Sequence, residues 1–204
     1  MKILIIGPNG SGKGTLSNLI SKRTNIPIIT SSSILESSGL DIATGRLLPD
    51  DVVNPIMLSS IKNMNSVILD GYPRTLNQNE TLMKSGFIPD LVIVLNIELS
   101  SVLERSCGRR ICEQCNDCYN LSGFRLPKVD EVCDICGGKL IQRKDDAPET
   151  VAFRYESYLN DTEPIITKYR YLDNGKTITW MFDAEEGMDK ISGAIVDYMS
   201  YMNS

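Results

Sequence analysis

The stretch Gly7-Pro8-Asn9-Gly10-Ser11-Gly12-Lys13-Gly14-Thr15 decides the fold. It follows the apolar run of residues 2–6, which predicts a fully buried strand, and it opens a helical pattern over residues 13–24. Glycines allow backbone dihedrals that point successive N–H groups inward, and a helix N-terminus favours an anion. Lys13 would then reach the outer phosphates of a bound nucleotide. A glycine-rich turn without a ligand is the alternative, which the spacing and context disfavour.

Further short apolar runs alternate with helical patterns along the chain. The expected strands are residues 27–29, 67–69, 91–95 and 177–182, and the expected helices include residues 148–171 and 188–202. Continuously apolar strands separated by helices are typical of a parallel sheet covered on both faces. With right-handed crossovers, this pattern predicts a doubly wound α/β fold.

The composition narrows the class of protein. The 204 residues carry a formal net charge of -5, six cysteines and no histidine, and 42% are hydrophobic. We expect one globular domain with an inserted subdomain, no broad nucleic-acid-binding face and no membrane span. The N-terminal apolar run is too short for a signal peptide, so we expect a cytoplasmic protein with reduced thiols. Without histidine, serine–histidine and cysteine–histidine mechanisms are excluded, as are histidine metal ligands.

Residues 108–143 break the α/β pattern and hold five of the six cysteines. Two pairs have the C-x2-C spacing of a four-thiolate zinc site, namely Cys112, Cys115, Cys133 and Cys136. Disulfide pairing is the alternative, which a reducing compartment disfavours. Cys118 is left out because two pairs complete a tetrahedron, and Cys107 is expected to be a packed thiol. With four protein ligands, such a zinc would be structural.

A second predicted strand is followed by polar residues that could bind a ligand. Asp70 follows the apolar run 67–69, at the sheet edge where ligands bind in open α/β folds. A carboxylate there suits Mg²⁺, directly or through water, and Arg74 could present its forked guanidinium to a phosphate. An ordinary strand-to-helix turn is the alternative.

Four separate motifs resemble the adenylate kinase family. They are Gly-Lys-Gly-Thr at 12–15, Asp-Gly-Tyr-Pro-Arg-Thr at 70–75, Gly-Arg-Arg at 108–110, and the Arg-x-Asp-Asp string that runs from 143 through Glu-Thr-Val to the arginine at 154. The cysteine insert looks like the zinc-bearing lid of the long form of this family. The resemblance implies reversible phosphoryl transfer from ATP or another triphosphate to AMP, with Mg²⁺ and a structural Zn²⁺. A kinase for other nucleoside monophosphates, or a weakly catalytic nucleotide-binding module, remains open.

The resemblance also implies roles for individual residues. The catalytic set is Lys13, Arg74, Arg109, Arg143 and Arg154, with Asp145 and Asp146 fixing the closed lid. The ATP site is Gly10, Ser11, Gly12, Lys13, Gly14, Thr15, Arg105 and the backbone near Ala184, and Asp70 holds Mg²⁺ through water. The AMP site is Ser31, Leu48, Gly71, Arg74, Gln78, Arg143 and Arg154.

The acceptor segment, at about residues 30–50, departs from the family pattern. Glu36 stands where the family has a phosphate-binding arginine, and the chain between Glu36 and Gly45 is shorter than is typical. We hypothesise that Arg46 partly compensates and that the base pocket is permissive. The expected division is a P-loop core of residues 1–107 and 144–204 around a zinc-ribbon lid of residues 108–143. A monomer or a small homo-oligomer, such as a trimer, is expected.

Overall fold

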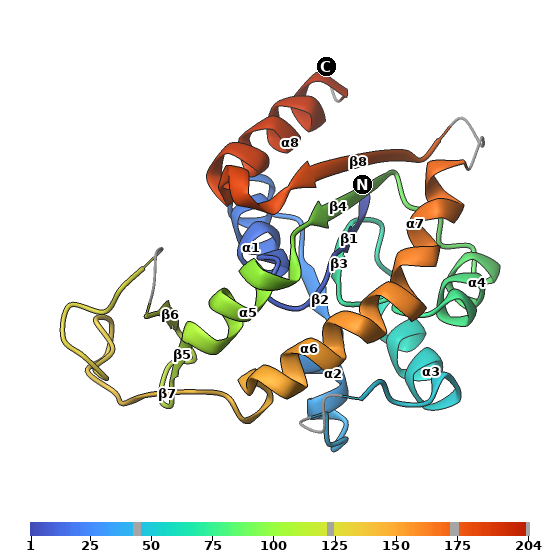
Figure 1. The fold of residues 1–204 in the computed structure, drawn as a ribbon. Helices are drawn as coiled ribbons and strands as arrows, with labels where there is room; N and C mark the ends of the chain where they lie inside the picture. Colours follow the sequence, from blue (N-terminus) through green and yellow to red (C-terminus); the bar gives the residue numbers. More distant parts are fainter. Residues whose placement is uncertain (43–45, 122–124, 172–175, 203–204) are drawn as a thin grey trace.

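A parallel five-stranded sheet forms the centre of the protein in the computed structural model, which describes residues 1–42, 46–121, 125–171 and 176–202 (Figure 1). Its order is β2-β3-β1-β4-β8. The strands are β1 (Lys2–Ile6), β2 (Ile28–Thr30), β3 (Val67–Asp70), β4 (Leu91–Asn96) and β8 (Ile178–Asp183). All four strand pairings are parallel. The predicted doubly wound α/β sheet is confirmed, with β2 and β8 each displaced by one residue from the predicted start.

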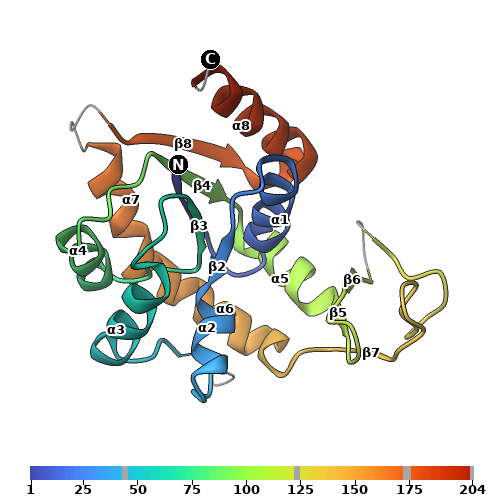
Figure 2. The ribbon, with the colours of Figure 1, turned by 180° about the vertical axis from the view of Figure 1, so that it is seen from behind.

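Helices cover both faces of this sheet because its strands are apolar on both sides. In β1, Ile3 and Ile5 enter one core cluster, whereas Leu4 and Ile6 enter the other. The first cluster is completed by α1 (Lys13–Thr24), α5 (Leu99–Gly108) and α8 (Met188–Met202). The second is completed by α2 (Ser31–Ser37), α3 (Asp50–Ile61), α4 (Leu76–Lys84) and α7 (Glu163–Arg170) (Figures 1 and 2).

The helix predicted over residues 148–171 is confirmed, and it contains one irregular turn. The chain is helical from Pro148 to Arg170 through α6 (Pro148–Ser157), a π-helical turn η2 (Tyr158–Thr162) and α7. Pro164 lies in the first turn of α7, directly after the π-helical turn. This turn has a consequence for the cleft, because Thr162 Oγ1 donates a hydrogen bond of 2.8 Å to the Arg74 carbonyl.

The cysteine-rich insert forms a second, antiparallel sheet that projects from the end of α5 (Figure 1). Its order is β6-β5-β7, with β5 (Arg109–Cys112), β6 (Cys118–Asn120) and β7 (Leu140–Ile141). Its buried cluster contains only four residues in the described part of the insert: Cys112, Tyr119, Cys133 and Leu140. The 3-10 turn η1 (Lys144–Asp146) leads back to α6, and η3 (Ala184–Glu186) precedes α8. Such a small core is consistent with a fold that depends on a bound metal.

Candidate functional site

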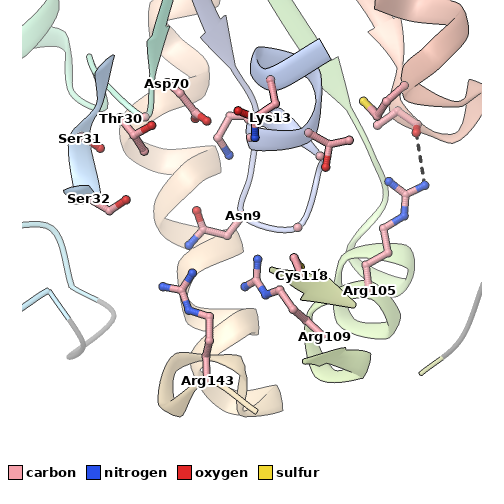
Figure 3. A pocket seen from close by; sticks show the side chains of 18 of the residues that line it. Asn9, Lys13, Thr30, Ser31, Ser32, Asp70, Arg105, Arg109, Cys118 and Arg143 are labelled. Atoms are coloured by element: carbon pink, nitrogen blue, oxygen red, sulfur yellow. Dashed lines mark hydrogen bonds between the residues drawn. The ribbon is translucent and has the colours of Figure 1, made fainter. Parts of the chain in front are cut away.

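A cleft of about 1210 Å³ opens where the glycine-rich loop, the carboxyl end of β3, the insert and η3 meet. Side chains from these separate elements point into the same space in Figure 3, among them Lys13, Asp70, Arg109 and Arg143. The predicted site residues that line it are Gly10, Gly12, Lys13, Gly14, Thr15, Ser31, Leu48, Asp70, Gly71, Arg74, Gln78, Arg105, Arg109, Arg143, Arg154 and Ala184. The fold therefore gathers segments from most of the chain around one cavity.

The glycine-rich loop holds its lysine close to its own backbone. Lys13 Nζ donates hydrogen bonds of 2.8 Å to the carbonyls of Gly7 and Pro8. Burial lowers the pKa of Lys13 to about 8, and the nearby carboxylate of Asp70 only partly opposes this effect. A phosphate in the loop would supply the negative charge that this buried ammonium lacks.

Two glycines of the loop have left-handed backbones that other residues rarely adopt. Gly10 has a φ of 83° and Gly12 a φ of 92°. A Cβ at Gly12 would also lie 3.0 Å from the methyl carbon of Met188. Ser11, between them, is buried; its N–H donates to the Pro8 carbonyl at 3.2 Å, and its hydroxyl has no hydrogen-bond partner within the described residues.

Asp70, the last residue of β3, and Arg74, four residues later, line the same cleft as the glycine-rich loop. Burial raises the pKa of Asp70, against the opposing charges of Lys13 and Arg74. A Cβ on Gly14 would lie only 3.7 Å from Asp70 Oδ2, so this carboxylate faces the start of α1. Gly71 has a φ of 79°, and its missing side chain leaves room for Ser31 and Arg74 to approach its backbone. A Cβ at this position would lie 2.7 Å from Ser31 Oγ and 3.0 Å from Arg74 Nη2.

Two buried aspartates of η1 organise three arginines of the cleft. Asp145 accepts hydrogen bonds of 2.8 and 3.0 Å from Arg143 and another from Arg154 Nη1. Asp146 accepts from Arg109 Nε at 2.9 Å and from Arg109 Nη2. Burial alone would raise the pKa of Asp145, but Arg143 and Arg154 outweigh it and the pKa is lowered. Asp145 thus stays ionised, and both aspartates hold guanidinium groups at the cleft.

One wall of the cleft is formed by α5 and η3. Arg105 Nη2 donates a hydrogen bond of 3.3 Å to the Ala184 carbonyl, drawn as a dashed line in Figure 3. This contact brings together two residues that the sequence assigned to the same nucleotide but that lie 79 positions apart. The arrangement is consistent with a base held between α5 and the turn before α8.

Helix α2 contributes only some of its residues to the cleft. Ser31, Ser32 and Leu35 of α2 line the cleft, whereas Glu36 is exposed and is not among the lining residues. Arg46 lines the cleft and is also exposed, so it is available to an anion there. Gly45 lies outside the described residues.

The four predicted metal-ligating cysteines converge in the insert, and their Sγ atoms lie within 4.8 Å of one another. The Sγ distances are 3.4 Å for Cys112–Cys136 and 3.6 Å for Cys115–Cys133, close to the roughly 3.8 Å separating thiolates around a tetrahedral zinc. All four are free thiols, and Cys118 is not part of the cluster. The donor set therefore fits a tetrahedral metal such as zinc.

Both knuckles have the same backbone geometry. Asn116 and Gly137, each four residues after the first cysteine of its pair, have φ values of 58° and 74°. Their N–H groups donate to the carbonyls of Cys112 and Cys133, at 3.0 and 2.9 Å. A Cβ on Gly138 would lie 2.9 Å from Cys112 Sγ, so glycine is needed beside the cluster.

Comparison with known proteins agrees with these motifs. The family model described as adenylate kinase matches residues 5–174. The adenylate kinase of Clostridium tetani is 35% identical over 219 residues, covering 96% of this chain and 100% of that protein. That of Thermococcus sibiricus is 37% identical, covering 99% and 95%, and that of Petrotoga mobilis is 33% identical, covering 100% and 99%. The chain belongs to the adenylate kinase family.

In this adenylate kinase family member, the insert contributes cleft residues that the sequence reasoning missed. They are Asn116, Asp117, Cys118, Tyr119, Asn120 and Arg125. Strand pairing explains their position, because β6 lies antiparallel to β5 and sets Asn120 opposite Arg109. The sequence alone does not indicate that these residues line the cleft, because this depends on the register between β5 and β6.

Within the described ranges, the structure has no helix whose length and apolar character would let it cross a bilayer.

Proposed function

We propose that this adenylate kinase family member transfers a phosphoryl group reversibly from ATP to AMP, producing two ADP. The observation that carries the proposal is the convergence of five cationic side chains on one cleft that begins at a glycine-rich loop: Lys13, Arg74, Arg109, Arg143 and Arg154. Such a concentration of positive charge suits two polyanionic nucleotides held end to end.

The chemistry needs positioning and charge neutralisation more than proton transfer. The acceptor is a phosphate oxygen that is mostly ionised at neutral pH, because its second pKa is about 6. No general base is required, which fits a chain without histidine. The buried pairs that Asp145 and Asp146 form with arginines support orientation of the guanidinium groups before substrate arrives.

The residues of the cleft fit a magnesium ion bound with the triphosphate. Asp70 is a buried carboxylate that faces the start of α1, and Thr15 brings a hydroxyl to the same cleft. We propose that Asp70 holds the ion through water, since Mg²⁺ usually keeps several waters. The ion would neutralise charge on the phosphates.

We also propose that Cys112, Cys115, Cys133 and Cys136 hold a structural zinc. Their sulfur spacing supports this assignment, and four protein ligands leave no open position for catalysis. Residues 108–143 then form a lid stiffened by the metal, carried by a core of residues 1–107 and 144–204. Lid closure would exclude water that otherwise hydrolyses the donor.

A second candidate is a kinase with a broader choice of nucleoside monophosphate. The acceptor segment is shorter than is typical of the family, and Glu36 is exposed and does not line the cleft. Both features favour this candidate, because fewer side chains of the segment would contact the acceptor base than in a typical family member. We propose a cytoplasmic setting, because a four-cysteine metal site requires the cysteines to stay reduced. A monomer or small homo-oligomer is proposed, and light scattering after gel filtration would distinguish them.

A coupled assay with ATP, Mg²⁺ and AMP, CMP, UMP or GMP tests the function. We expect turnover with AMP, and we expect Arg154→Ala to lower kcat/KM by at least about 100-fold, because it removes a cleft cation. As a matched control, Arg170→Ala removes an exposed arginine from the last turn of α7 and should leave kcat/KM unchanged. Absence of turnover with all four monophosphates would contradict the kinase proposal.

A further inference from the structure

One carboxylate, that of Asp50, gathers three side-chain donors at the acceptor wall. Its Oδ2 accepts from Thr75 Oγ1 at 2.8 Å and from Asn77 Nδ2 at 3.0 Å. Its Oδ1 accepts from Gln78 Nε2 at 2.8 Å. Asp50 begins α3 and the three donors come from the start of α4, so this network joins two helices beside the cleft.

The network determines which way the Gln78 amide faces. Gln78 is 2% exposed and lines the cleft. While Nε2 donates to Asp50, Oε1 accepts from the backbone N–H of Arg74 at 2.7 Å. If the amide were rotated by 180°, Oε1 would face a carboxylate and the NH₂ group would face an N–H donor. Both contacts would be repulsive, so the hydrogen-bond chemistry of the partners permits one orientation.

The backbone next to this amide is also fixed. Thr75, the N-cap of α4, accepts from the Gln78 backbone N–H at 3.1 Å while its hydroxyl donates to Asp50. The same residue thus anchors both the start of the helix and the carboxylate. Because cap, carboxylate and amide form one connected set, Gln78 has little freedom to adapt to a different ligand.

Each end of the locked amide keeps one hydrogen-bonding position. Oε1 has a second lone pair and Nε2 has a second N–H. A base that offers an amino group next to an unprotonated ring nitrogen complements this pair, and adenine and cytosine do so. Hypoxanthine, guanine and uracil offer a carbonyl next to a ring N–H, which is the opposite pattern and would require the rotated amide.

We propose that Asp50 is a positioning residue that acts through Gln78 to select an acceptor base with an amino edge over one with a keto edge. The proposal rests on the proposed function for its assumption that the acceptor base reaches Gln78. It supplies a basis for specificity that does not depend on the shortened stretch between Glu36 and Gly45, because its residues belong to α3 and the start of α4.

The test compares AMP with inosine monophosphate, which has the same purine skeleton but carries a carbonyl and ring N–H in place of the amino group and free ring nitrogen. We expect the wild-type protein to prefer AMP by about 10-fold or more in kcat/KM, and to prefer CMP over UMP in the same direction. In Asp50→Asn, the new amide can donate to a rotated Gln78, which relieves one of the two repulsive contacts and leaves that with the Arg74 N–H. The AMP/IMP ratio should therefore fall by at least about threefold without being abolished.

Asp51→Asn is the matched control, because it removes the same charge from the same turn of α3 at an exposed position. Its AMP/IMP ratio should equal that of the wild type. Asp50→Glu keeps a group that only accepts hydrogen bonds, and it should keep the preference for AMP. Thermal unfolding shows whether each variant is folded. A general loss of activity lowers kcat/KM for AMP and IMP equally, so it leaves their ratio unchanged.

Several outcomes would overturn the proposal. They are equal use of AMP and IMP by the wild type, a preference for UMP over CMP, or an unchanged AMP/IMP ratio in folded Asp50→Asn. If Asp50→Asn does not fold, the wild-type pairs and Asp50→Glu still decide the matter. Calorimetric binding of AMP and IMP without ATP separates this proposal from the proposed function, because it measures base preference even if no phosphoryl transfer occurs.

Discussion

Arg109 donates from both Nε and Nη2 to the carboxylate of Asp146, although 37 positions separate the two residues. Arg109 begins β5, where the chain enters the insert, and Asp146 ends η1, where the chain has left it. Asp146 is 1% exposed. The pair therefore ties together the two connections of the insert, and Arg109 also lines the cleft.

Replacing Asp146 by Asn should damage both stability and catalysis. The change leaves Arg109 without its carboxylate partner, and a hydrogen bond that involves a charged group contributes about 1.5–3 kcal/mol. We expect a loss of this size in the free energy of unfolding and at least about a 10-fold fall in kcat, measured by denaturant titration and the coupled assay. Glu80→Gln is the control, since its pair with Lys168 is exposed and should contribute less than about 1 kcal/mol. Wild-type kcat in Asp146→Asn would show that the pair is purely structural.

ATP binding should take up protons at alkaline pH. Burial lowers the pKa of Lys13 to about 8 in the free protein, and bound phosphate would raise that pKa again. Uptake should therefore be roughly half a proton per ATP at pH 8 and near zero at pH 6.5, where the ammonium is already charged. Calorimetry in buffers of different ionisation enthalpy measures this number. Lys13→Arg does not titrate in this range, so the same uptake in that variant would assign the proton to another group.

The lowered pKa of Lys13 also determines how the free energy of unfolding depends on pH. The pKa of Lys13 is lower in the folded than in the unfolded chain, so the unfolded chain binds more protons between about pH 8 and 10.5. The contribution of Lys13 to the free energy of unfolding thus rises with pH across this window. Lys13→Met should remove that rise from the pH profile of the unfolding free energy.

The thiolate cluster should bind one zinc ion per chain. We expect Cys115→Ser to lose the metal, and we expect metal removal with a strong chelator to lower Tm, because the insert has little apolar core of its own. Cys118→Ser and Cys107→Ser are matched controls outside the cluster and should retain the metal. Elemental analysis of the purified proteins gives the stoichiometry. Full metal content in Cys115→Ser, or its loss in Cys118→Ser, would contradict the assignment.

Tyr119 should strengthen metal binding although it is not a ligand. Its hydroxyl accepts from the Asp134 N–H at 2.8 Å, so its own proton is free to face Cys133 Sγ at 3.5 Å. Hydrogen bonds to ligating groups orient them, and their loss typically weakens metal binding by 10-fold or more. We expect about a 10-fold weaker zinc affinity in Tyr119→Phe, measured by competition with a chromophoric chelator. An unchanged affinity would reduce Tyr119 to a packing role.

The sequence predicted those parts of the structure that depend on local pattern. The glycine-rich stretch, the apolar strands and the C-x2-C pairs each carry their signal within a few residues, and the sheet and the cysteine cluster follow the prediction. The long helix over residues 148–171 follows the prediction too, but its apolar pattern does not indicate the π-helical turn that precedes Pro164.

Other features depend on tertiary packing and could not be predicted this way. The carboxylate of Asp50 meets Gln78 across 28 positions, and Asn120 reaches the cleft only because β6 pairs with β5. The direction of Glu36 depends on the rotation of α2 about its axis, which a motif alignment does not give. The roles of the individual site residues are predictions that substitution of each residue tests.

Two variants of the acceptor segment test how this chain holds the monophosphate without the family arginine. Glu36 is exposed and is not among the residues that line the cleft, so Glu36→Gln should leave the KM for AMP unchanged. Arg46 lines the cleft from the shortened segment, so Arg46→Ala should raise the KM for AMP by about 10-fold, the effect of losing one charge-assisted phosphate contact. The kcat at saturating AMP should change little, because the contact is equally strong before and during transfer. A lower KM in Glu36→Gln would mean that Glu36 repels the acceptor phosphate, and an unchanged KM in Arg46→Ala would remove Arg46 from the acceptor site.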